Sequence, residues 1–141
     1  MRKLALFVLI FGVLISPLVG AEYLVYSIGE GVTSEFIFIN PTDTPIQIVV
    51  DFYDQEKTPV EVSLEEYGEF SSFWVSLAPW EVWKCQTAES IELQSGYMKA
   101  DLIFKKGIVL VNINHNGIKL SEQIKQGMEE VTIITRGRKK K

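Results

Sequence analysis

The chain of 141 residues contains one cysteine and one histidine, and their scarcity excludes several kinds of chemistry. A single cysteine, Cys85, cannot form an internal disulfide, so we expect a small buried hydrophobic residue, with an intermolecular disulfide as the alternative. A blue-copper site needs two histidines and a cysteine, and catalytic zinc normally takes three protein ligands led by histidine. Since His115 alone supplies neither set, the sequence predicts no metal and no cofactor.

Candidate catalytic groups are equally few. Cys85 and His115 could act as nucleophile and base only if the fold brought them together, and nothing in the pattern indicates that it does. The pairs Glu65-Glu66 and Glu129-Glu130 have the residue type of glycoside hydrolases, but adjacent acidic residues usually lie on a solvated face. We predict a non-catalytic protein, with an enzyme built on a Cys85–His115 dyad as a less favoured alternative.

One long hydrophobic run is present, at residues 4–15, and its flanks are those of a signal peptide. Arg2-Lys3 precedes the run, and the small residues Val19-Gly20-Ala21 follow it where signal peptidase would cleave. The run is shorter than the ~20 apolar residues that span a bilayer. We therefore predict a signal peptide over residues 1–21 and an exported protein, periplasmic or extracellular. A segment retained as a membrane anchor is the alternative.

Positive charge is scarce after residue 21, except at the end of the chain. Acidic residues outnumber basic ones there, and five of the basic residues are Arg136, Arg138, Lys139, Lys140 and Lys141. An acidic body repels nucleic acid, so a nucleic-acid partner is disfavoured. Residues 136–141 contain nothing apolar to pack and are predicted to form a disordered basic tail, either solvated or in weak contact with an anionic membrane surface.

Alternating apolar and polar residues, interrupted by turn residues about every ten positions, predict one all-β domain over residues 22–135. Residues 36–39 are apolar at every position, as in a strand covered on both sides. Asn116-Gly117 predicts a hairpin with a type I′ turn. Near the end, a spacing of four predicts a short C-terminal helix before a closing strand at residues 131–134. The predicted helix has one apolar face, made of Leu120, Ile124 and Met128. In one of the predicted strands, the residues that share a face are Met98, Ala100, Leu102 and Phe104.

The stretch Asn-Pro-Thr-Asp-Thr-Pro at residues 40–45 separates two apolar runs. Its two prolines fix φ and restrict the residues before them, so both strands must stop there. Asp43 is expected to accept a hydrogen bond from the backbone two residues on, as in an Asx-turn. Calcium binding is the competing interpretation, but Asp51 and Asp54 should fall on opposite strand faces, so turn formation is favoured.

Residues 36–64, FIFINPTDTPIQIVVDFYDQEKTPVEVSL, resemble the start of immunoglobulin-like modules of exported bacterial proteins. In those modules this pattern leads to a later Leu-x-Pro and Gly-Tyr, which here are Leu77-Ala78-Pro79 and Gly96-Tyr97. The chain is more distantly similar to the sensory-rhodopsin transducer family, whose members act inside the cell. The resemblance implies an antiparallel Ig-like β-sandwich and carries no functional motif. It also departs from the pattern, since the usual glycine is missing from the turn at residues 54–57.

All three tryptophans, Trp74, Trp80 and Trp83, lie within one short segment. Tryptophan is by default a core residue, but strand alternation places Trp74 opposite Phe73 and Val75. Trp80 and Trp83 should fall on opposite faces of the following strand. We therefore predict a contact surface that includes these tryptophans, in a binding or scaffolding module with a protein or glycan partner. A small carbohydrate-binding module is the alternative.

Export generates the first testable prediction. Mass spectrometry of the native protein should find a mature chain that begins at Glu22, because the small residues before it form the cleavage site. A chain that begins at Met1 and fractionates with the membrane would instead show a tethered domain.

Overall fold

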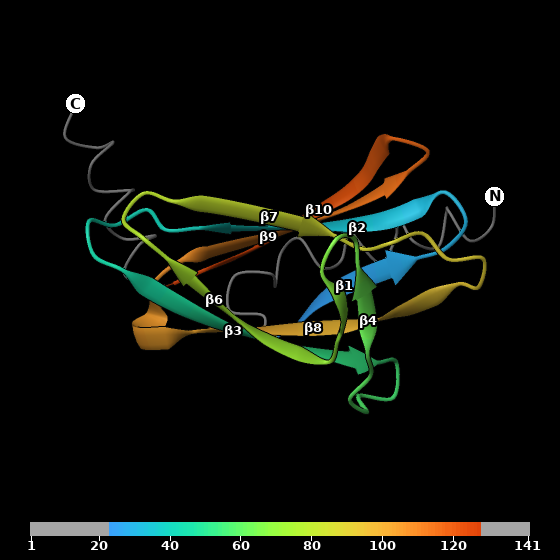
Figure 1. The fold of residues 1–141 in the computed structure, drawn as a ribbon, viewed down its shortest axis with the longest axis horizontal. Coiled ribbons are helices and arrows are strands. Elements are labelled where there is room, and N and C mark those ends of the chain that lie inside the picture. Colours follow the sequence, from blue (N-terminus) through green and yellow to red (C-terminus); the bar gives the residue numbers. More distant parts are fainter. Residues whose placement is uncertain (1–22, 128–141) are drawn as a thin grey trace.

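The computed structural model describes residues 23–127, which form a β-sandwich of two antiparallel four-stranded sheets (Figure 1). A two-stranded hairpin and a short turn element, η1, complete the described part of the chain, in which no helix is long and apolar enough to cross a membrane. In the order of neighbouring strands, sheet A contains β1 (Tyr23–Ile28), β8 (Gln94–Leu102), β3 (Ile46–Asp54) and β6 (Ser72–Leu77). In the same order, sheet B contains β10 (Ile118–Gln126), β9 (Ile108–His115), β2 (Val32–Ile39) and β7 (Val82–Gln86). The hairpin contains β4 (Val62–Leu64) and β5 (Gly68–Phe70), and η1 is Ile103–Lys105.

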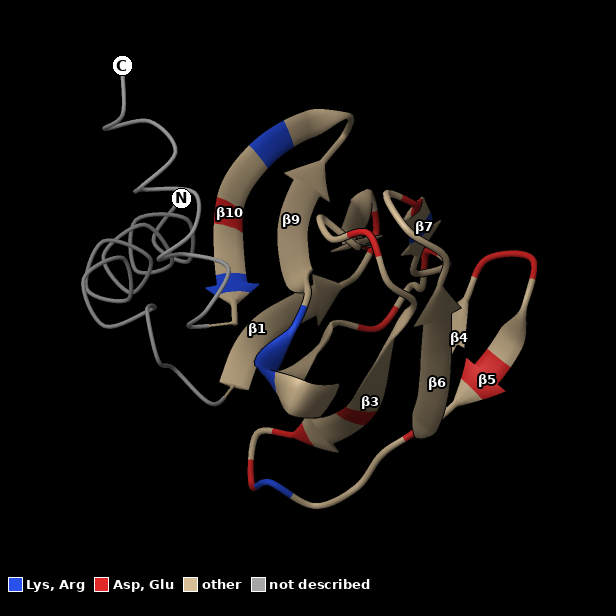
Figure 2. Cartoon of the chain, turned by 90° about the vertical axis from the view of Figure 1, so that its left-hand side faces the viewer, with Lys and Arg blue, Asp and Glu red and all other residues tan. Residues whose placement is uncertain are grey.

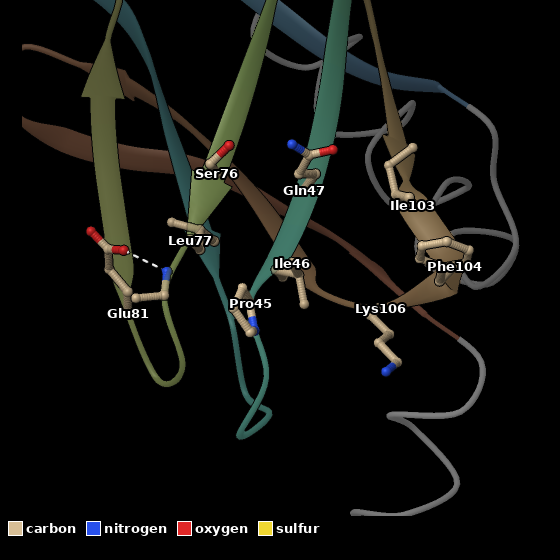
Figure 3. Close-up of a pocket in the computed structure, with 10 residues that line it drawn as sticks. Pro45, Ile46, Gln47, Ser76, Leu77, Glu81, Ile103, Phe104 and Lys106 are labelled. Carbon is tan, nitrogen blue, oxygen red and sulfur yellow. Dashed lines mark hydrogen bonds between the residues drawn. The ribbon is translucent and has the colours of Figure 1, made fainter.

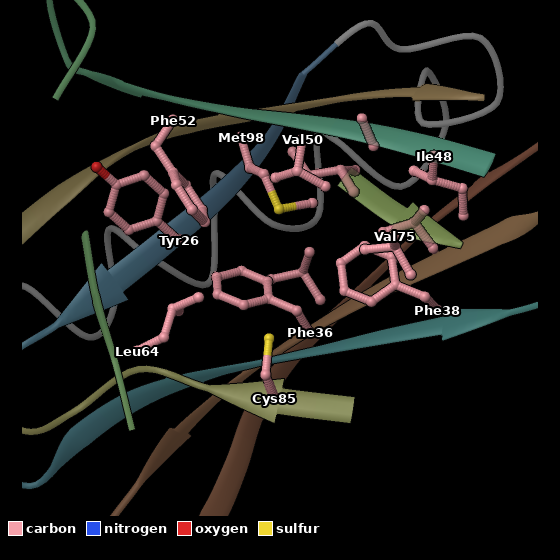
Figure 4. Packing of buried hydrophobic residues seen from close by; sticks show 14 of the residues in the cluster. Tyr26, Phe36, Phe38, Ile48, Val50, Phe52, Leu64, Val75, Cys85 and Met98 are labelled. Carbon is pink, nitrogen blue, oxygen red and sulfur yellow. The ribbon is translucent and has the colours of Figure 1, made fainter. Parts of the chain in front are cut away.

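The core lies between the two sheets and follows from the alternation of the strands. Every second residue of β1, β2, β3 and β8 is buried, and large aromatic rings from both sheets meet in the middle (Figure 4). Phe52 of sheet A lies 5.6 Å, ring centre to ring centre, from both Phe36 and Tyr26. Burying each such side chain stabilises the fold by about 1.5–3 kcal/mol, so the interior holds the sandwich together without a disulfide.

The central strands follow the immunoglobulin arrangement, whereas the outer strands do not. β8 pairs with β3 and β3 with β6, as strands F, C and C′ do in variable domains, and β2 pairs with β7, as B and E do. However, β1 lies beside β8, the place of strand G, and β9 with β10 lies beside β2, the place of strand A. The chain is thus an all-β sandwich with its own arrangement of edge strands.

The predicted C-terminal helix is wrong, because Leu120 and Ile124 lie in strand β10. A spacing of four residues is also a multiple of two, so it fits a strand as well as a helix, and pairing with β9 decides between them. The Asn116-Gly117 turn starts that pairing, with positive φ at both residues as predicted, and a register shift lies between Lys119 and Ser121. Met128 lies outside the described residues, as do the predicted strand at residues 131–134, the predicted signal peptide and the predicted basic tail.

The apolar run at residues 36–39 was predicted to be covered on both sides, and the structure covers one side fully. Phe36 and Phe38 are completely buried in the core, whereas Ile37 and Ile39 are half-buried on the outer face of sheet B. Across the strands, Ile39 lies between Val82 of β7 and Ile108 of β9. The outer face of sheet B is therefore aliphatic where β2 ends.

The free edge of β1 is closed by side chains from the opposite sheet. Gln123 of β10, only 2% exposed, accepts a hydrogen bond from the Val25 N–H (2.9 Å) and donates one to the Val25 carbonyl (2.8 Å). Ser34 of β2 does the same for Ser27, at 2.9 Å and 2.7 Å. These side chains replace a neighbouring strand, and they join the two sheets along this side.

Replacing Gln123 by alanine should lower the free energy of unfolding by about 2–4 kcal/mol, since it leaves two backbone groups of Val25 without partners. Urea unfolding measures the change, with faster hydrogen exchange of the Val25 amide as a local signature. Gln126→Ala is the matched control on the exposed part of β10 and should change stability by less than about 0.5 kcal/mol. Equal losses in the two variants would contradict the bridging role of Gln123.

Candidate functional site

Three connections at one end of the sandwich cross from one sheet to the other. They are the β2–β3 connection (residues 40–45), the β6–β7 turn (residues 78–81) and the β8–β9 connection (residues 103–107), seen at the left of Figure 1. We call this the loop end. The opposite end carries the β1–β2, β3–β4, β7–β8 and β9–β10 connections, and the β4–β5 turn lies beside β7.

Asn40 joins two of the three connections of the loop end, β2–β3 and β6–β7. Its side chain is completely buried, and its amide nitrogen donates to the carbonyls of Thr44 (2.8 Å), Ala78 (2.9 Å) and Leu77 (3.2 Å). Its side-chain oxygen accepts from the Thr42 N–H at 2.9 Å, so the Asx-type turn predicted for Asp43 is made by Asn40 instead. The reason is burial, because Asn40 reaches two connections from the interior, whereas Asp43 is exposed.

A groove of about 700 Å³ opens between the β6–β7 turn and the β8–β9 connection (Figure 3). The start of β3 forms its floor, and its lining is mostly apolar. Glu81 accepts a hydrogen bond from the Ala78 N–H at 2.7 Å, which holds the turn beside the groove. The lining residues are Pro45, Ile46, Gln47, Ser76, Leu77, Ala78, Glu81, Ile103, Phe104 and Lys106.

Trp80 stands at the tip of the β6–β7 turn and is 66% exposed. Pro79 precedes it, its own φ is +64°, and the Glu81 N–H donates to the Ala78 carbonyl at 3.1 Å. This is the arrangement of a type II turn, whose third position normally holds glycine or asparagine. A tryptophan held in this left-handed conformation costs about 1–2 kcal/mol of backbone energy.

Phe104 occupies a comparable position on the β8–β9 connection. Its φ and ψ are 58° and 23°, Lys105 also has positive φ, and the Lys106 N–H donates to the Ile103 carbonyl at 3.3 Å. Two successive positive φ angles are typical of a type I′ turn, which favours Asn-Gly. At the opposite end, the β9–β10 turn does use Asn116-Gly117, so the loop end departs from the usual turn residues.

The exposure of Phe104 corrects the sequence prediction. The alternation put Phe104 on the same strand face as Met98, Ala100 and Leu102, which are buried, but β8 ends at Leu102 and Phe104 is 84% exposed. The other non-glycine residues with positive φ outside the loop end, Lys57, Glu66 and Asn116, are polar. Among the described residues, bulky aromatic side chains in left-handed conformation therefore occur at the loop end alone.

The structure does not bring the three tryptophans onto one surface. Trp74 points outward from β6, as the alternation predicted, and is 67% exposed. It lies on the same face as Ser76, two residues or about 7 Å along the strand, so it borders the groove. Trp83 instead packs against the core, with ring centres 5.7 Å from Phe38 and 5.5 Å from Tyr67. The predicted surface thus consists of Trp74 and Trp80, and it lacks Trp83.

Cys85 and His115 are also far apart. Cys85 pairs with Phe36 on one side of β2, and His115 pairs with Val32 on the other side, ~13 Å along the strand. Burial raises the pKa of the Cys85 thiol to about 12, so its thiolate is rare at neutral pH. No group of three or more His, Cys, Asp or Glu residues that could hold a metal ion occurs within residues 23–127.

The missing glycine in the turn at residues 54–57 is explained by Lys57, which takes its place with φ of 65°. The Asp54 carboxylate accepts hydrogen bonds from the N–H groups of Glu56 and Thr58, both at 2.9 Å, and shapes the loop. The Lys57 ammonium then lies 4.8 Å from the centre of the Tyr23 ring. The cation–π contact gives this lysine a structural role.

Comparisons with known proteins give no match: no protein-family model, no curated protein and no solved structure is detectably similar to this chain. The basic residues that the sequence predicts to form the tail lie outside the described residues; they are Arg136, Arg138, Lys139, Lys140 and Lys141.

The buried thiol gives a direct test of the dyad alternative. Cys85 in the native protein should react with a thiol reagent at pH 8 at least tenfold more slowly than in the protein unfolded in urea, since burial raises its pKa to about 12. Rapid native labelling that depends on His115 would contradict this and reopen the enzyme hypothesis.

Proposed function

We propose that the protein is an exported, non-catalytic binding module of the cell envelope or extracellular space, and that the loop end is its contact surface. The observation that carries the proposal is the placement of Trp80 and Phe104. Both side chains are exposed, and both occupy turn positions where glycine or asparagine would be favoured.

Backbone strain at an exposed site supports a functional role, because it must be maintained by the surrounding structure and brings no gain in packing. Here the buried Asn40 amide and the paired strands supply that support. The aromatic side chains are consequently presented on rigid turns, and a partner that binds them loses little conformational freedom on the protein side.

The glycan alternative has one supporting feature, the exposed indole rings of Trp74 and Trp80 beside the groove. Sugar recognition also needs several convergent hydrogen-bonding groups. The groove offers few, and one of them, the Glu81 carboxylate, is already bonded to the Ala78 N–H. An apolar partner surface therefore fits the groove better than a sugar does.

Single substitutions at the loop end should remove binding without unfolding the domain. We expect Trp80→Ala or Phe104→Ala to reduce capture of the envelope partner by the immobilised mature protein about tenfold, as is usual for aromatic anchors. Ile91→Ala, at an exposed apolar residue of the opposite end, is the matched control and should bind like the native protein. Equal capture by all variants would contradict the proposal, and tryptophan quenching by an envelope glycan would favour the carbohydrate-binding alternative.

A further inference from the structure

We propose that the partner of the loop end is an anionic membrane surface, with Trp80 and Phe104 entering the interfacial region of the bilayer. The inference rests on the proposed function, because it names the partner of the same surface. It follows from three independent features: the chemistry of the two turns, the distribution of charge between the ends, and the point at which the basic C-terminal segment begins.

The two turns present the residue types that membrane interfaces favour. Phe104 projects from the β8–β9 connection and is followed directly by Lys105 and Lys106. Aromatic rings partition into the headgroup region, and neighbouring lysines are attracted to anionic headgroups. Trp80 lies on the other side of the groove and adds a second ring.

An aliphatic surface continues from these turns onto sheet B. Val82 directly follows the β6–β7 turn, Ile39 precedes the β2–β3 connection, and Ile108 follows the β8–β9 connection. The three residues are neighbours across the sheet and face outward. The loop end therefore offers an apolar margin to a bilayer in addition to its two aromatic rings.

Charge orients the molecule in the same direction. The connections at the loop end contain two acidic residues, Asp43 and Glu81, and two basic residues, Lys105 and Lys106. Figure 2, viewed from that end, shows a basic segment in blue leading into β9. At the opposite end, the connections contain Lys57 and a larger number of acidic residues, which an anionic surface would repel. Those acidic residues are Glu30, Glu56, Glu61, Glu89 and Glu92.

The chain also leaves the sandwich at the loop end. The Gly127 N–H donates to the Gly107 carbonyl at 3.2 Å, so the last described residue lies against the β8–β9 connection. The basic residues from Arg136 onward follow nine positions later, within about 30 Å of chain even when fully extended. A chain of that length is long enough for these residues to reach the same membrane surface as Lys105 and Lys106.

Binding of this kind should be reversible and sensitive to salt, because it combines two small apolar insertions with screened charge contacts. The experiment is flotation of the mature protein, residues 22–141, with vesicles of phosphatidylcholine, with and without phosphatidylglycerol. We expect binding to the mixed vesicles at low salt, at least tenfold weaker binding to phosphatidylcholine alone, and loss of binding at high salt.

Variants identify the loop end as the docking surface. Trp80→Ala, Phe104→Ala and the Lys105→Gln/Lys106→Gln pair should each weaken binding at least threefold, while truncation after Thr135 should weaken it further. Matched controls at the opposite end are Ile91→Ala and Lys119→Gln, which should bind like the native protein. Near-ultraviolet circular dichroism and urea unfolding confirm that each variant is folded.

Three results would overturn the inference. The first is that the native protein floats with neither vesicle. The second is that the controls and the loop-end variants lose binding equally. The third is that truncation alone removes binding while the aromatic variants bind normally. If flotation fails but Trp80→Ala and Phe104→Ala still lose an envelope partner, that partner is a protein. The proposed function then stands without the membrane.

Discussion

The side-chain amide of Asn40 is the interaction on which the loop end depends. It is completely buried and bonded to backbone carbonyls of two different connections, so it holds the β2–β3 and β6–β7 crossings in one arrangement. A buried amide without partners would be destabilising by several kcal/mol, which makes this arrangement strongly preferred. The groove floor and the turn that carries Trp80 both follow from it.

Crossing between the sheets does not by itself require an aromatic residue in a left-handed conformation. The β1–β2 and β7–β8 connections also cross between the sheets, at the opposite end, and the β2–β3 connection crosses at the loop end without a positive φ. The β6–β7 and β8–β9 connections reverse the chain with turns of types II and I′, which need positive φ. Glycine or asparagine would satisfy that geometry at little cost, as Asn116-Gly117 does at the opposite end. The loop end has Trp80 and Phe104 at these positions, so two aromatic side chains are exposed and the backbone conformation is less stable than it would be with glycine.

Much of the fold could be predicted from alternation alone. The inward faces of β3 and β6 and the outward direction of Trp74 follow from a period of two, because each strand has one buried face. The error at Leu120 and Ile124 arose because a spacing of four fits both a helix and a strand. Sheet membership was also beyond the sequence, since β1 pairs with β8 and does not pair with β2, the next strand in the chain.

The candidate site was only partly predictable, for a local reason. Turns of types II and I′ are recognised by glycine and asparagine, and the turns at Trp80 and Phe104 carry neither residue at the decisive positions. Phe104 therefore looked like the continuation of β8, and Trp80 looked like the start of a strand. The proline at position 79 and the Lys-Lys-Gly after Phe104 were the available signals for these turns.

The central claim is that Trp80 and Phe104 are held in left-handed turns for contact and contribute little to folding. The free energy of unfolding of the double variant Trp80→Gly/Phe104→Gly tests it most directly. Relief of strain, about 1–2 kcal/mol at each site, exceeds the added flexibility of glycine, about 0.5–1 kcal/mol at each site. The account predicts that urea unfolding will show stability higher by about 1 kcal/mol. A fall of more than 1 kcal/mol would contradict the account, because it would show that the two aromatic side chains support the fold.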